Sequence, residues 1–207
     1  MHIVSVKEKI SVVISRAENK LAGAVSAFSY DFRGKIVLDI GSSTGGFTEY
    51  VINAGARKVI AVEKGTRQMK EPLRFSKKVE LHEKTDIFNV TSCETLGGTS
   101  EVLIEQPDVI VADVSFVSLK KVLEYVKKRI ANKNTDLLVM LKPQFEARGE
   151  QLHRGIVKNE KIRRQIILDF EQWLKMAGFL IVKKHDNELK GRNGNKERFY
   201  YLKLAKS

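Results

Sequence analysis

Short apolar runs alternate with amphipathic helical patterns along most of this chain, and this alternation restricts its fold more than any other feature. Six runs rich in Val, Ile and Leu lie at residues 36–40, 59–62, 79–81, 109–112, 137–141 and 179–182. Buried strands of this composition, separated by helices, are typical of a parallel sheet. A seventh run, 199–204, follows the sixth after the loop "LKGRNGNKE" and predicts an antiparallel hairpin. We therefore expect a Rossmann-like α/β fold, with a mostly parallel seven-stranded sheet, one antiparallel strand and helices on both faces.

Three helices have clear signals at their ends. Ser15 and Glu18 have capping-box spacing, which predicts a helix to about Phe28. Ser118 is a candidate N-cap for a second helix, and a third follows Asn159. We expect one domain over residues 15–207. Residues 1–14 are ambiguous between helix and strand and form an extension or linker.

The composition favours a polyanionic partner. The 207 residues include 37 Lys and Arg against 25 Asp and Glu, a net charge of +12. Such an excess favours contacts with nucleic-acid phosphates, although a basic enzyme without such a partner has the same balance. The apolar runs are far shorter than the roughly 18 residues of a membrane span. One cysteine and four separated histidines form no ligand pattern, so we expect no metal site and a cytoplasmic location.

A glycine-rich loop follows the first strand, in "VLDIGSSTGGFTEYV". Ligands of open α/β sheets bind beyond the carboxyl ends of the strands, where glycines let the backbone approach them closely. The next strand ends at Glu63, 17 residues after Gly46, and a carboxylate there can hold both hydroxyls of a ribose. The dinucleotide and phosphate-loop patterns are absent. A nucleoside ligand without pyrophosphate, such as S-adenosylmethionine (SAM), fits better than a nicotinamide dinucleotide. A plain glycine turn beside a solvated Glu63 is the alternative.

The segments "SRAENKLAGA", "VLDIGSSTGGFTEYVINAGA", "DVSFVSL", "LKPQFEA" and "GNKERF" resemble, in order, blocks of the TlyA-type hemolysin and ribosomal RNA methyltransferases. These belong to the wider FtsJ-like ribose 2′-O-methyltransferases. The similarity covers residues 15–204. It implies a SAM-dependent methyltransferase fold and the transfer of a methyl group to a ribose 2′-hydroxyl of RNA, most plausibly ribosomal RNA.

The resemblance also implies roles for particular residues. The family's catalytic Lys–Asp–Lys–Glu tetrad matches Lys20, Asp113, Lys142 and Glu197. Cofactor-binding positions match Gly41, Ser43, Thr44, Gly45, Gly46, Phe47, Glu63, Asp86 and Asp113, with Glu63 on the ribose and Asp86 at the adenine. Family members usually carry a small RNA-binding domain ahead of this one. Its absence here suggests a fragment, a domain that acts alone, or a separate partner.

The strand assignment supports the tetrad without the family. Asp113 and Lys142 directly follow two predicted parallel strands, and Glu197 precedes the returning strand of the hairpin. All three therefore meet the glycine loop at one sheet edge, whereas Lys20 depends on how its helix docks. We interpret Lys142 as the base that takes the hydroxyl proton and Lys20 as its neighbour. Taken singly, Lys142 could be an ordinary strand-end lysine, Asp113 a capping or loop carboxylate, and Glu197 a solvated residue of the hairpin.

The basic segment 147–161 lies beside the proposed base and predicts contacts with an RNA backbone, or a closing lid. The expected RNA-binding residues are Arg148, Arg154, Lys158 and Arg192. Three alternatives stay open at this point: a catalytically inactive SAM- or RNA-binding protein of the same fold, a cytolysin as the hemolysin name suggests, and a nicotinamide-dependent oxidoreductase, which the glycine spacing disfavours.

Overall fold

The structure is a computed structural model that describes residues 15–93, 102–187, 189 and 194–205. The expected extension at residues 1–14 and the candidate RNA-binding residue Arg192 lie outside the described residues.

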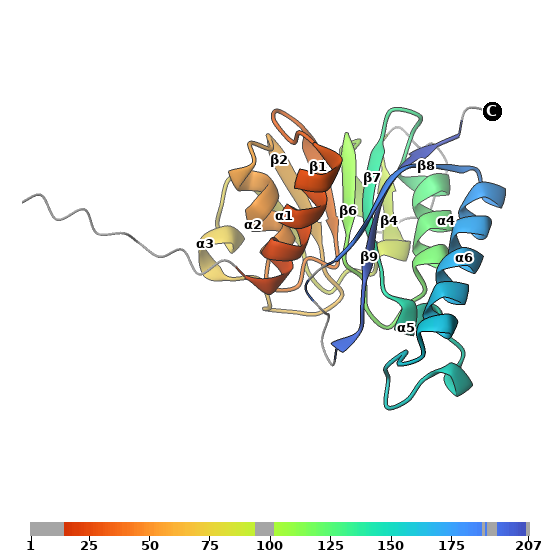
Figure 1. Cartoon of the computed structure of the whole chain (residues 1–207). Helices are drawn as coiled ribbons and strands as arrows, with labels where there is room; N and C mark the ends of the chain where they lie inside the picture. The colour runs from red at the N-terminus through yellow and green to blue at the C-terminus, as the bar shows by residue number, and fades with distance from the viewer. Residues whose placement is uncertain (1–14, 94–101, 188, 190–193, 206–207) are drawn as a thin grey trace, which may run out of the picture.

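A seven-stranded sheet forms the centre of the molecule (Figure 1). Its order is β3-β2-β1-β6-β7-β9-β8. β9 runs antiparallel to both of its neighbours, and the remaining pairs are parallel. The strands are β1 (Ile36–Ile40), β2 (Lys58–Val62), β3 (Val79–His82), β6 (Val109–Ala112), β7 (Asp136–Leu141), β8 (Phe179–Asp186) and β9 (Arg198–Leu204). The predicted sheet, with its one antiparallel strand, is confirmed.

A small parallel pair of strands lies outside the main sheet. It consists of β4 (Val90–Ser92) and β5 (Val102–Ile104) and was not predicted from the sequence. Three residues per strand are too few for an alternation pattern to stand out.

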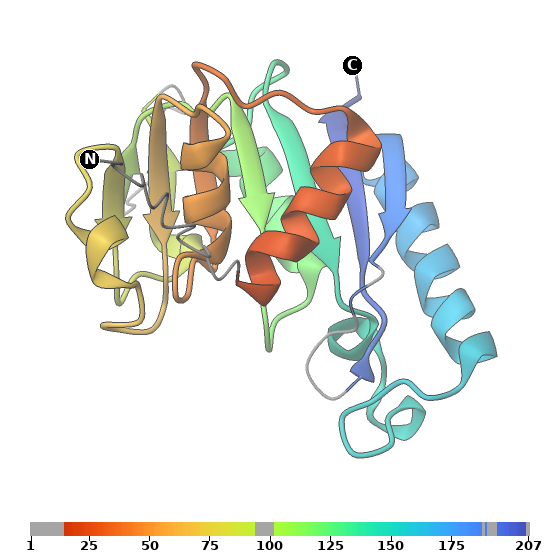
Figure 2. The ribbon, with the colours of Figure 1, turned by 60° about the vertical axis from the view of Figure 1, so that its left-hand side comes forward.

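Helices cover both faces of the sheet (Figure 2). The four longer ones are α1 (Arg16–Phe28), α2 (Gly46–Asn53), α4 (Leu119–Arg129) and α6 (Glu160–Met176). The shorter ones are α3 (Glu71–Arg74), α5 (Pro143–Glu146) and two 3-10 turns, Ile87–Asn89 and Gly149–Gln151. The predicted starts hold: α1 begins with the Ser15–Glu18 capping box, and the Asn159 side chain accepts hydrogen bonds from two backbone N–H groups of α6.

Two apolar cores lie on opposite sides of the sheet because successive strand residues point to opposite faces. In β1, Val37 packs with the side chains of α1 and α2, whereas Leu38 packs with those of α4 and α6. Both residues are fully buried. Among the described residues, no helix is long and apolar enough to cross a membrane. The two cores hold the sheet rigidly, so the side chains at its carboxyl edge have fixed positions.

Candidate active site

The glycine loop and the end of β6 are in direct contact at the carboxyl edge of the sheet. The Asp113 backbone N–H donates to the Ile40 carbonyl over 3.1 Å. Gly41 has a φ of +80°, and a Cβ atom on it would lie 2.9 Å from the Asp113 carbonyl oxygen. Both the backbone conformation and the close approach require glycine here. The loop after β1 therefore lies directly against the residue expected to be the catalytic aspartate.

A cavity of about 730 Å³ opens at this contact. Its lining includes five of the nine expected cofactor-binding residues: Gly41, Ser43, Glu63, Asp86 and Asp113. Apolar walls come from β1, β2 and the segments after β3 and β6, through side chains that include Ile87, Phe88 and Val114. The cavity is large enough for a nucleoside with an amino-acid side arm, since ligand pockets of this kind measure roughly 300–1,000 Å³.

The other expected cofactor residues lie away from the cavity lining. Phe47 is 3% exposed and packs against Phe199 with ring centroids 6.0 Å apart. A Cβ on Gly45 would meet Leu73, and one on Gly46 would meet Ala17 and Ser15, so both glycines permit close packing. Thr44 is exposed at the turn of the loop. These four residues shape the loop, and their side chains do not line the cavity.

Two carboxylates of the cavity are held by the backbone around them. Glu63 accepts hydrogen bonds from the Ser43 N–H over 2.9 Å and from the Gly65 N–H over 2.6 Å. It thus ties the glycine loop to the turn after β2. Asp86 caps the short 3-10 turn by accepting from the Phe88 N–H, and it pairs with the Lys64 ammonium at 2.9 Å.

Lys142 and Asp113 form the first of two lysine–carboxylate pairs. The Lys142 Nζ lies 2.5 Å from an Asp113 carboxylate oxygen and donates to the Ser115 Oγ over 2.8 Å. The two side chains are 12% and 21% exposed. Ser115, which also lines the cavity, was missed by sequence reasoning although it stands in the quoted "DVSFVSL" block.

The turn after Lys142 fixes the end of β7. Pro143 occupies the first position of α5, where its ring suits the helix and its missing N–H costs nothing. The Glu146 carboxylate then accepts from the Ser118 Oγ over 2.7 Å and the Leu119 N–H over 2.6 Å at the start of α4. Burial raises the pKa of Glu146. The proline and the glutamate of "KPQFE" therefore lock the strand end that carries Lys142.

Lys20 of α1 and Glu197, which directly precedes β9, form the second pair at the edge of the sheet. Their charged atoms are 2.5 Å apart, and the residues are only 8% and 2% exposed. Leu141 is paired with Arg198 in the β7–β9 ladder, so Lys142 and Glu197 are the next residues beyond that pair. The structure thus brings all four tetrad positions to one edge as two ion pairs, and Lys142 contacts Asp113 and Ser115 rather than Glu197.

Asp39 is a further acidic group that the sequence analysis did not select. It lies within β1, is fully buried and accepts from the Thr48 Oγ1 over 2.6 Å, while its other carboxylate oxygen has no hydrogen-bond partner among the described residues. Burial raises its pKa to about 7, and the nearby Asp113 charge adds to the rise. The signal in the sequence was an aspartate inside an otherwise apolar strand.

The candidate RNA-binding loop lies beside Glu197. Its three described candidates, Arg148, Arg154 and Lys158, are all exposed. The buried Asn195 accepts from the Val157 N–H over 3.2 Å and donates to the Gly155 carbonyl over 3.1 Å. This amide fastens the loop two residues before Glu197.

An exposed aromatic residue stands at the mouth of the cavity. Phe116 lines the cavity, is 92% exposed and has a φ of +63°. Its ring lies 5.3 Å from that of Phe145. The exposed Phe116 ring is therefore accessible to a ligand at the mouth of the cavity.

In the described part of the chain, no three His, Cys, Asp or Glu side chains gather as a metal site would require. The arrangement instead offers two ammonium groups, each held by one carboxylate, beside a cavity that the Glu63 carboxylate lines.

Known proteins resemble this chain over nearly its whole length. It is 34% identical to the 23S rRNA (cytidine-2′-O)-methyltransferase TlyA of Campylobacter jejuni, over 92% of this chain and 70% of that protein. The same identity and chain coverage are found for the 16S/23S rRNA (cytidine-2′-O)-methyltransferase TlyA of Mycobacterium tuberculosis, 68% of which is covered. A solved structure of a protein described as a hemolysin from Streptococcus thermophilus superposes with a TM-score of 0.84 at 30% identity, covering 97% of this chain and 70% of that one. The model of the FtsJ-like methyltransferases matches residues 13–204, and this chain therefore belongs to that family.

Proposed function

We propose that the protein transfers the methyl group of SAM to a ribose 2′-hydroxyl of ribosomal RNA. The observation that carries this proposal is the pairing of Lys142 with Asp113 and of Lys20 with Glu197 at one edge of the sheet, beside the cavity. The names of the two TlyA relatives, which specify cytidine 2′-O-methylation of ribosomal RNA, support the same substrate class.

The cavity fits SAM in size and in chemistry. Glu63 provides a carboxylate for the two ribose hydroxyls, and apolar Ile87 and Val114 provide surfaces for a purine ring. Gly41 and Asp113 both line the cavity, and the glycine lets the loop lie against the Asp113 backbone, where the amino-acid arm would bind. When bound, SAM supplies a methyl group activated by a sulfonium, so no protein nucleophile is required.

The protein's own task is then to align the ribose hydroxyl and to accept its proton. A hydroxyl attacks well only when its proton is leaving, and a neutral lysine amine can take that proton. Lys142 is our candidate base because its Nζ is fixed by Asp113 and Ser115 beside the cavity. Paired with Asp113 it is an ammonium, so it accepts the hydroxyl proton only after it has released one of its own protons to solvent. Lys20, held by Glu197, adds a second cation that orients the target nucleotide. Correct alignment contributes as much as proton transfer to such a reaction.

Two surface features suit an RNA substrate. The exposed Phe116 ring offers a stacking platform for an unpaired base. The loop fastened by Asn195 presents Arg148, Arg154 and Lys158, whose charges suit phosphates. A cytoplasmic location, expected from the sequence, fits this substrate, as would a separate RNA-binding domain or partner that selects the target.

The test is mass spectrometry of ribosomal RNA nucleosides after incubation with the protein and SAM. We expect a new 2′-O-methylated nucleoside with the wild-type protein. Lys142→Ala should abolish it and retain SAM affinity by calorimetry, because Lys142 is outside the cavity lining. SAM binding without any methylation by the wild-type protein would instead support the catalytically inactive binding protein. Leakage of lipid vesicles on addition of the protein would support the cytolysin.

A further inference from the structure

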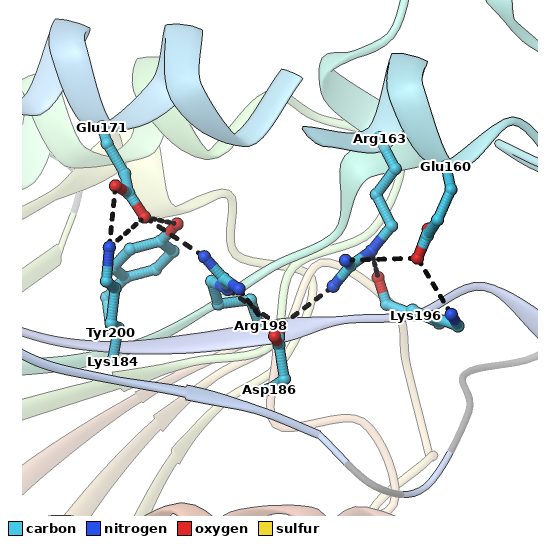
Figure 3. Close-up of polar contacts among 8 residues, drawn as sticks. All are labelled: Glu160, Arg163, Glu171, Lys184, Asp186, Lys196, Arg198 and Tyr200. Carbon is cyan, nitrogen blue, oxygen red and sulfur yellow. Dashed lines mark hydrogen bonds and ion pairs between the residues drawn. The ribbon is translucent and has the colours of Figure 1, made fainter. Parts of the chain in front are cut away.

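The β8–β9 hairpin is tied to α6 by a chain of ion pairs that we call the α6 clamp (Figure 3). At its centre, Asp186 accepts from Arg163 Nη2 over 2.9 Å and from Arg198 through bonds of 2.8 and 2.6 Å. Arg198 also reaches Glu171 at 3.3 Å, and Lys196 reaches Glu160 at 2.9 Å. The α6 clamp thus consists of Glu160, Arg163, Glu171, Asp186, Lys196 and Arg198.

The α6 clamp holds the two residues that flank Glu197. Lys196 and Arg198 bind carboxylates of α6 on one face of the sheet, whereas Glu197 between them meets Lys20 of α1 on the other face. This is the alternation expected of extended backbone. Two bonds fix the intervening main chain: the Asn187 N–H donates to the Glu197 carbonyl over 3.0 Å, and Arg163 Nε donates to the Lys196 carbonyl over 3.4 Å.

We propose that Arg163 and Asp186 are positioning residues that hold Glu197 against Lys20. The contribution of this contact to catalysis rests on the function proposed above. Glu197 precedes β9 and has no ladder partner of its own in the β7–β9 pairing, which ends at Arg198. Its orientation therefore depends on its neighbours. The Arg163 side chain is 9% exposed, so loss of the Asp186 charge would leave this buried cation without a partner that compensates it, which is costly.

The charges of the α6 clamp fit a holding role better than a ligand site. The adjoining cleft of about 570 Å³ mixes five cations with three carboxylates, Glu160, Glu171 and Asp186. A bound phosphate would have to displace these carboxylates from their arginine and lysine partners. The Arg198 hydrogen bonds lower the pKa of Asp186 to about 2, so this carboxylate at the centre of the α6 clamp stays ionised at any pH suited to an enzyme assay.

The deciding experiment measures the coupling between Lys20 and Glu197 without using activity. Urea unfolding of Lys20→Met, Glu197→Gln and the double variant yields their coupling free energy, first in the wild-type background and then in Asp186→Asn. We expect the coupling to fall by at least half when the α6 clamp is cut. An unchanged coupling would overturn the inference. Ile167→Val on α6, 5% exposed and with no polar side chain, is the control for a general loss of stability and should leave the coupling intact.

A second measurement asks whether the loss reaches the reaction. Arg163→Met and Asp186→Asn should lower kcat on ribosomal RNA by roughly 10-fold or more, as small displacements of catalytic groups do. SAM affinity should stay within about twofold, and Arg163→Lys should recover part of kcat by restoring the charge. Unchanged kcat in both variants would overturn the catalytic role. A wild-type protein that shows the coupling but methylates no RNA would overturn the proposed function. In that case Arg163 and Asp186 would still hold Glu197 against Lys20, but this contact would have no role in catalysis.

Discussion

Neutralising Asp39 should remove a pH dependence from the stability of this protein. The carboxyl group is fully buried, and the Thr48 hydroxyl donates a hydrogen bond to it. Burial raises its pKa from 3.8 to about 7. The folded state therefore holds a proton on Asp39 between about pH 4 and pH 7, where the unfolded state has released it.

The sign and the size follow from this difference. Because the folded state binds the extra proton, its stability falls as the pH rises through this window. A shift from 3.8 to about 7, at about 1.4 kcal/mol per unit, corresponds to roughly 4 kcal/mol lost by pH 8. Asp39→Asn has no proton to release, so its stability should lack this component. The buried amide adds an offset of its own, but that offset does not change with pH.

The assay is urea unfolding of wild type and Asp39→Asn at several values from about pH 4 to about pH 8. The difference between the two curves should shift by several kcal/mol in favour of the variant as the pH rises. Asp31→Asn is the matched control. An Arg33 hydrogen bond lowers the pKa of exposed Asp31 to about 2, so its effect is confined to lower pH. A difference curve for Asp39→Asn that stays level over the whole range would refute the reasoning.

Three further changes test the loop, the aromatic platform and the basic surface. Gly41→Ala should destabilise the fold by roughly 1–3 kcal/mol more than Gly34→Ala in thermal unfolding; both glycines have positive φ, but only the first would press a Cβ on Asp113. Phe116→Ala should lower kcat/KM for RNA by roughly 10-fold, the loss of one base stack, and leave SAM affinity unchanged in calorimetry. An unchanged kcat/KM would remove Phe116 from the RNA site. Arg148, Arg154 and Lys158 are the three cations of the basic loop. Replacing all three by glutamine should weaken RNA binding and reduce the slope of log K against log salt concentration by roughly one per lost phosphate contact. Equal salt slopes would place the RNA elsewhere.

Strands could be predicted from the sequence where their burial produces a run of apolar residues. Where a strand is exposed or very short, its ends were predicted less well. All seven strands of the main sheet were expected because each carries an apolar run, and in β1, β2, β6 and β7 that run is buried on both faces. β8 was expected to end at residue 182, but it continues through polar residues to Asp186. As the edge strand it faces solvent with much of its length, so pairing with β9 alone defines its end. The four-residue helices α3 and α5 span little more than one helical turn, which is too short for a helical pattern to be recognised in the sequence.

In the candidate site too, some contacts could be predicted from the sequence pattern and others depend on tertiary packing. The proximity of Asp113 and Lys142 could be predicted from the sequence because each follows a parallel strand, and the carboxyl ends of neighbouring parallel strands lie at the same edge. The Lys20–Glu197 contact could not be predicted in this way, since it depends on how α1 packs on the sheet. The roles of Asn195 and Glu146, which fasten a loop and a helix start, depend on contacts 28 to 40 residues away in the chain. No local spacing encodes such contacts.

The strand order explains why Asp113, Lys142 and Glu197 meet at the edge of the sheet that carries the candidate site. The chain builds outward from β1 in one direction to β3 and then returns to add β6 on the other side, and ligands of open sheets bind at such a reversal. Beyond it, β6, β7 and β9 are neighbours, so Asp113, Lys142 and Glu197 follow one another along the edge. With strands about 4.8 Å apart, the three span roughly 10 Å, a distance comparable to one nucleotide. Glu197 precedes its strand, so it reaches this edge only because β9 runs antiparallel. In a parallel β9 the same residue would lie at the opposite edge, away from Lys20 and Lys142, so the one antiparallel strand is a requirement of the site as well as of the fold.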